Sequence, residues 1–78
     1  MSTTPTKSTK LVVRRWDRAA ALSREALPVI RDTFVDLPVD HDAAREAAKK
    51  RAVALTNAKR VRGVSALVAG GFSVAVEL

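Results

Sequence analysis

The last sixteen residues, from Gly63 to Leu78, contain no basic residue and one acid, Glu77, whereas all fourteen Lys and Arg precede them. This tail is rich in Val, Ala and Leu, so it must be buried against the rest of the chain, a partner protein or a bilayer. A basic cluster of Lys59, Arg60 and Arg62 ends just before the tail. The division into a basic, polar body and an apolar tail therefore limits the folds that are open to the chain.

The length of 78 residues supports at most one domain with a small core, which stabilises a fold only marginally. The sequence contains no Cys, so disulfides and thiolate metal sites are excluded, and its single His excludes an imidazole cluster. Oligomerisation or docking on a larger partner is the remaining source of support. We expect no cofactor.

The first half of the chain is predicted to be helical after a flexible, Ser/Thr-rich arm at residues 1–9. Small and apolar side chains recur at alternating steps of three and four, as they do on one face of a helix. These side chains are Val12, Trp16, Ala19, Ser23, Ala26, Ile30 and Phe34. Pro28 lacks an amide donor and its ring crowds the preceding turn, so we expect the helix to be kinked there.

A second helix is predicted from His41 to about Arg62. The segment before it contains Pro38 and is typical of a turn, and Asp40 is a suitable N-cap. The segment itself is rich in Ala, Lys, Arg and Glu, which favour helix. Two helices joined by a short turn fold back on each other. The predicted fold class is therefore mainly α, with an antiparallel helical hairpin over residues 10–62.

The tail, residues 63–78, has two interpretations. As a β-hairpin, its two apolar runs flank Gly70-Gly71, which allows the positive φ angles of a two-residue turn. This hairpin would pair Ala69 with Phe72 and Leu67 with Val74. As a membrane helix, the tail has small residues spaced by four, but residues 64–76 would span only about 20 Å of a ~30 Å hydrocarbon core. Its short length and Glu77 favour the β-hairpin.

The sequence does not indicate an enzyme. His41 lies between Asp40 and Asp42, which is an arrangement expected in the acidic first turn of a helix. No serine lies in a nucleophile-elbow motif, and no glycine-rich phosphate loop is present. We therefore predict no catalytic, cofactor-binding or metal-binding residues.

The basic charge is concentrated in one segment, since residues 45–62 hold seven basic side chains and one acid, Glu46. Basic side chains on a helix can neutralise nucleic-acid phosphates. The candidate phosphate contacts are Arg45, Lys49, Lys50, Lys59, Arg60 and Arg62. On a helical wheel these side chains scatter around the helix, which is also what solvated surface charges do.

The resulting functional hypothesis is a small, non-catalytic structural or interaction protein. It would be a homo-oligomer or a subunit of a larger assembly, such as a phage or other particle component. Candidate interface residues are Trp16, Ile30, Phe34, Leu55, Leu67, Phe72, Val74 and Val76. The polar N-terminus has no apolar signal segment, which favours a location in the cytoplasm or in a particle assembled there.

Two alternative functions remain open. The first is a membrane-associated protein with a cytoplasmic basic body and the apolar tail as its anchor. The second is a non-specific nucleic-acid-binding protein that uses the basic second helix.

Overall fold

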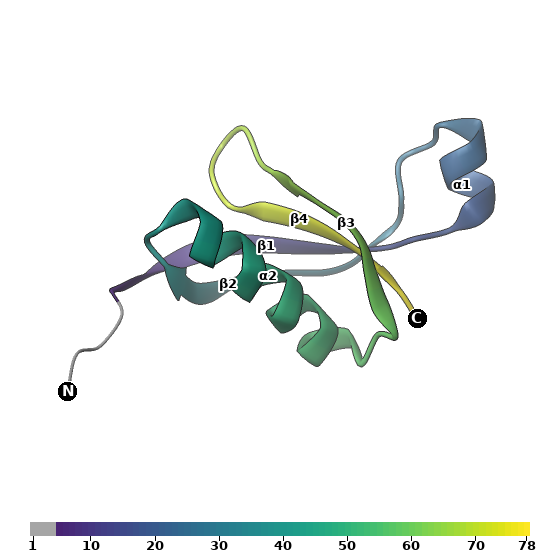
Figure 1. The fold of residues 1–78 in the computed structure, drawn as a ribbon. Helices are drawn as coiled ribbons and strands as arrows, with labels where there is room; N and C mark the ends of the chain where they lie inside the picture. Colours follow the sequence, from purple (N-terminus) through teal and green to yellow (C-terminus); the bar gives the residue numbers. More distant parts are fainter. Residues whose placement is uncertain (1–4) are drawn as a thin grey trace.

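The computed structural model describes residues 5–78, which form an α+β domain with a four-stranded mixed sheet. The elements are β1 (Thr6–Arg15), α1 (Arg18–Ser23), β2 (Val29–Pro38), α2 (His41–Thr56), β3 (Arg60–Ala66) and β4 (Phe72–Glu77). The strand order is β2-β1-β4-β3, and α2 packs across one face of the sheet (Figure 1). The prediction of a mainly α fold, with a helical hairpin over residues 10–62, is therefore wrong.

The predicted first helix is replaced by a strand, a short helix and a second strand. In β1 the side chains of Leu11 and Val13 are fully buried, which is the period of two expected for a strand with one face on the core. The helical stripe contained Val12 and neither Leu11 nor Val13; Val12 is also buried, at 7% exposure, but on the opposite face of the sheet. Pro28 does not kink a helix: it directly precedes β2. Residues 6–9 of the predicted arm belong to β1, and residues 1–4 lie outside the described part of the chain.

Helix α1 lies in the connection between β1 and β2, at one end of the domain (Figure 1). The Asp17 side chain caps it by accepting a hydrogen bond from the amide of Ala19 at 3.2 Å. It ends at Arg24, whose φ of 59° is left-handed. Among the described elements, none contacts α1. Helix α1 therefore projects from one end of the sheet and does not pack on either of its faces.

Helix α2 begins at the predicted N-cap, where a carboxylate oxygen of Asp40 accepts a hydrogen bond from the amide of Ala43 at 2.9 Å. Its buried side chains are all small, namely Ala44, Ala48 and Ala52. Small side chains allow the helix to approach the sheet closely. The helix ends at Asn57, with a left-handed φ of 56°, so the predicted extension to Arg62 is wrong.

The core lies between α2 and the sheet. Leu11 and Val13 of β1, Leu37 of β2, and Val74 and Val76 of β4 contribute its largest fully buried side chains. Strand β4 pairs in parallel with β1 and antiparallel with β3, and Val13 lies opposite Val74. The end of the apolar tail is thus a central strand, which is buried against the rest of the same chain.

The connection between β3 and β4 runs over residues 67–71, so it is longer than the predicted two-residue loop. The observed register pairs Ala66 with Phe72 and Val64 with Val74, and the predicted register is wrong. The amide of Leu67 donates to the carbonyl of Gly71 at 2.9 Å and closes this loop. The tail is not a membrane helix, and no helix within residues 5–78 has both the length and the apolar character needed to cross a bilayer.

Candidate functional site

A groove follows the outer edge of the sheet between α2 and β3. The α2 side of this groove is a stripe of residues spaced by four, which therefore lie on one face of the helix. These residues are His41, Arg45, Lys49 and Val53, and Val61, Val64 and Ala66 of β3 face them. A small hollow of about 30 Å³ lies beside Arg45, and a shallow, widely open hollow of about 390 Å³ lies beside Val53. We call this feature the α2–β3 groove.

The α2–β3 groove combines an apolar floor with basic side chains. Val53, Val61 and Val64 are half-buried and form the floor. Arg45 is exposed, and the Lys49 ammonium lies 3.1 Å from Glu46 in an ion pair across one helical turn. The neighbouring Lys50 also lines the wider hollow. The local charge is therefore positive above a surface that can bury aliphatic side chains.

Strand β3 forms one edge of the sheet. Within residues 5–78 it pairs with β4 alone, so the backbone groups along its other edge have no partner strand. Unpaired N–H and C=O groups on an edge strand can accept a further strand. The ladder with β4 shifts register between Val61 and Gly63, which leaves Arg62 as an extra residue, as in a β-bulge.

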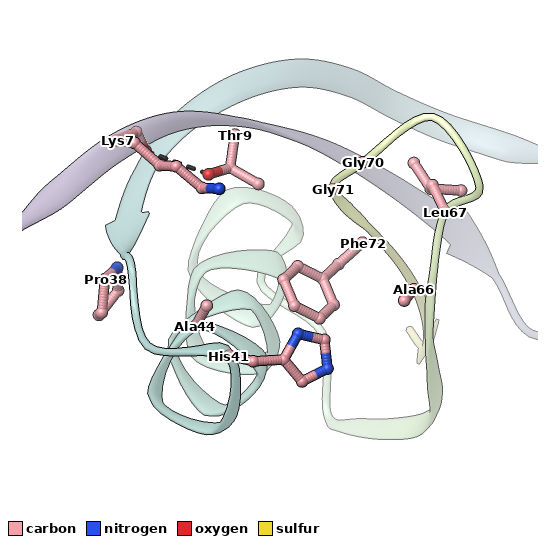
Figure 2. A pocket seen from close by; sticks show the side chains of 10 residues that line it. All are labelled: Lys7, Thr9, Pro38, His41, Ala44, Ala66, Leu67, Gly70, Gly71 and Phe72. Carbon is pink, nitrogen blue, oxygen red and sulfur yellow. Dashed lines mark hydrogen bonds between the residues drawn. The ribbon is translucent and has the colours of Figure 1, made fainter.

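A pocket of about 230 Å³ adjoins the groove at the N-terminal end of α2 and shares His41, Ala66 and Phe72 with its smaller hollow (Figure 2). Lys7 and Thr9 of β1, His41 and Ala44 of α2, and Phe72 of β4 contribute to its walls. The His41 and Phe72 rings are 5.6 Å apart between centroids and inclined at 37°. The Thr9 hydroxyl donates to the carbonyl of Lys7 at 3.1 Å. The ionisable side chains of this lining are Lys7 and His41, and the lining residues include no carboxylate.

The face of the sheet opposite α2 is not covered by any described helix or strand, and we call it the open face. Phe34 lies on it because its neighbour Val35 packs towards the core, and its side chain is 67% exposed. Lys10, paired with Phe34 in the ladder, lies 3.8 Å from the Asp32 carboxylate. The open face therefore presents a large aromatic side chain among charged ones.

The structure distributes the eight candidate interface residues between the core and the surface. Phe72, Val74 and Val76 are buried in the core, and Leu55 packs against it from α2. Leu67 and Trp16 are half-buried. Ile30 and Phe34 are exposed on β2.

The six candidate phosphate contacts do not share one surface. Arg45, Lys49 and Lys50 lie on α2, whereas Lys59 precedes β3 and Arg60 and Arg62 lie on that strand. The Glu77 carboxylate lies 2.9 Å from the Arg60 guanidinium and 3.9 Å from that of Arg62. Half of the set, including Lys49, is thus engaged with acids of the same chain.

Sequence reasoning missed the floor of the α2–β3 groove. It extended the helix to Arg62, which placed Val61 on the apolar face of that helix and left no strand to form the opposite wall. The available signals were the helix-ending residue Asn57 and the valines Val61 and Val64 in a segment that is otherwise polar. Neither signal indicates by itself that β3 lies at an edge.

The comparisons with known proteins do not assign the chain to a family: no family model matches it, and no curated protein or solved structure is significantly similar.

Proposed function

We propose that this chain is a non-catalytic protein-interaction module that acts as a subunit of a larger assembly. The observation that carries the proposal is the uncovered face of the sheet, on which Phe34 of the edge strand β2 is exposed. An aromatic side chain has a large apolar area whose burial by a partner is favourable, and its rigid ring loses little entropy on binding. Val29 and Ile30 are also exposed on β2, and the charged Asp32 lies between them and Phe34 along the strand.

The small size of the domain supports the same proposal. A chain of 78 residues buries a limited fraction of its surface by folding, and association with another protein increases that fraction. The sheet also ends in two edge strands, β2 and β3, which are each paired on one side within the described residues. The face and the edges therefore offer complementary modes of protein contact.

The proposal is tested by the size of the native complex in extracts of the source cell. We expect the tagged full chain to elute from a sizing column well above its own mass of 8.4 kDa. Phe34→Asp places a charge on the open face and should shift the chain to the monomer position. Val68→Asp, at an exposed position in the connection between β3 and β4, is the matched control and should leave the complex intact. Elution of the unaltered chain as a monomer would contradict the proposal.

Nucleic-acid binding is the second hypothesis, and the ion pairs of Lys49, Arg60 and Arg62 give it less support. A phosphate contact at these positions would compete with a carboxylate that is already in place. A single-stranded nucleic acid is therefore the ligand against which a peptide bound in the α2–β3 groove should be compared.

A further inference from the structure

We propose that the α2–β3 groove binds an extended, acidic segment of a partner protein, which adds to β3 as a fifth strand. This inference rests on the proposed function, because it names the surface and the chemical class of one partner.

The outer edge of β3 offers two regular stretches for strand addition, residues 60–61 and 63–66, on either side of the bulge at Arg62. The strand's outer edge is unpaired, and the helix stripe of α2 runs beside it, from His41 near Ala66 to Val53 near Val61. A peptide that hydrogen-bonds to such an edge directs every second side chain towards the helix. These side chains would enter the two hollows over Val53, Val61 and Val64. Backbone pairing thus supplies affinity, and the groove selects the side chains.

The charge of the groove selects acidic side chains on the peptide. Arg45 and Lys49 lie one helical turn apart on the stripe, and Lys50 adjoins the wider hollow. Glu46 is the one acid paired with this set, through Lys49. Residues 41–66 carry seven basic side chains and two acids, and Glu77 of β4 pairs with Arg60 and Arg62. The basic side chains still outnumber the acids around the groove, so the surrounding field also favours an acidic ligand.

A second copy of this chain fits the groove poorly. Its other edge strand, β2, directs Arg31, Thr33 and Val35 towards the helix side of the sheet, as the pairing of Arg31 with Val13 shows. In a continued sheet, Arg31 would therefore approach the basic stripe of α2. The acids of β2, Asp32 and Asp36, lie on the opposite face. The charges that β2 offers to the groove thus have the wrong sign, and a separate acidic partner is the better occupant.

The experiment is a titration of the isotopically labelled full chain, followed by NMR, with a defined peptide. The probe is an end-blocked peptide of sequence Thr-Val-Thr-Glu-Thr-Val-Thr-Glu-Thr, in which Val and Glu alternate on one side of a strand. We expect the largest amide shifts in β3 and along the stripe of α2. Amides on the outer edge of β3 should also become protected from hydrogen exchange, because they gain a strand partner.

Matched variants separate groove binding from general attraction. Arg45→Glu with Lys49→Glu reverses the charge of the stripe and should weaken binding at least about tenfold, through loss of two charge contacts. Arg18→Glu with Arg31→Glu produces the same change in net charge away from the groove and should alter affinity little more than about twofold. Of two peptides with Pro in place of the central Thr or of the adjacent Val, one loses an amide that donates to β3 and should not bind.

Several results would overturn the inference. One is the absence of shifts up to about 1 mM peptide, and another is equal weakening by the two double variants. A third is tighter binding of a single-stranded oligothymidylate than of the peptide at the same amides, which would identify the groove as a nucleic-acid site. Self-association without peptide, seen by sedimentation and located to β3 by protection of its outer amides, would also contradict it.

The test distinguishes this inference from the proposed function. If the peptide does not bind but Phe34→Asp still dissociates the native complex, the groove assignment fails and the interaction module stands. If the chain is also monomeric in extracts, both proposals fail.

Discussion

The guanidinium carbon of Arg62 lies 4.1 Å from the centroid of the Trp16 ring. Arg62 is the extra residue in the β3–β4 ladder, and Trp16 directly follows β1, so the contact spans β4 between them. The amide of Trp16 donates to the carbonyl of Val76 at 2.8 Å, and Glu77 lies 3.9 Å from Arg62. Residues far apart in the sequence therefore close one end of the sheet together.

We predict a measurable coupling free energy between Trp16 and Arg62. Stacking of a guanidinium on an indole at a partly exposed site contributes about 0.5–1 kcal/mol. A double-mutant cycle with Trp16→Ala and Arg62→Gln, followed by urea denaturation, should recover a coupling of that size. Arg60→Gln is the control, because it loses a contact with Glu77 but no stacking on Trp16. A coupling no larger for Arg62 than for Arg60 would show that the stack contributes nothing to stability.

Substitution by Ala is predicted to be more destabilising at Gly71 than at Gly70, the two glycines of the β3–β4 connection. Gly70 and Gly71 have φ angles of 97° and 99°, so Ala is strained at either position. A Cβ at Gly70 meets no atom within 4 Å, but one at Gly71 would clash with the carbonyl oxygen of Lys10. Gly70→Ala should therefore lower the free energy of unfolding by about 1–2 kcal/mol. Gly71→Ala should lower it by clearly more, since the β1 backbone must also move; equal losses would contradict this close approach.

The local sequence signals describe parts of this fold and mislead about the rest. Alternation of Phe72, Val74 and Val76 indicates a strand with one buried face, and Asp40 marks the start of α2. In β1, by contrast, Leu11, Val12 and Val13 form a continuous apolar run. Such a run is compatible with a helix or a strand. The spacing of four from Val12 to Trp16 favours a helix, whereas the structure has a strand. Here tertiary pairing decides the structure, because β1 has a strand on each side.

The parallel pairing of β1 with β4 could not be predicted from local patterns. It joins residues 11–15 to residues 72–76, so it depends on contacts between distant segments. Strand β3 contains Gly63, a residue type depleted in strands, and its ladder contains the register shift. The α2–β3 groove depends on this strand. The basic residues of the candidate site could therefore be identified from the sequence, whereas its apolar wall could not.

The different burial of Leu11 and Leu22 predicts that their replacement by Ala will have very different effects on the free energy of unfolding. Leu11 is fully buried under α2, whereas Leu22 on α1 is 75% exposed. Leu11→Ala should lower the free energy of unfolding by about 2–5 kcal/mol, because it removes buried methyl groups and leaves a cavity. Leu22→Ala should change it by less than about 0.5 kcal/mol. Thermal and urea unfolding of the two variants compares them directly, and a large loss at Leu22 would place α1 in a folded contact that the structure lacks.

Two helix caps with the same chemistry should contribute differently to global stability. Asp40 caps α2, which packs on the sheet, and Asp17 caps α1, which contacts no other described element. Asp40→Ala removes the acceptor for the Ala43 amide and should lower the free energy of unfolding by about 1 kcal/mol. Asp17→Ala should fray α1 locally and leave the global transition within about 0.5 kcal/mol, since a helix that contacts no other described helix or strand can open by itself. Urea denaturation followed by circular dichroism measures both losses. Equal losses at the two caps would mean that α1 unfolds together with the sheet, against the separation seen in Figure 1.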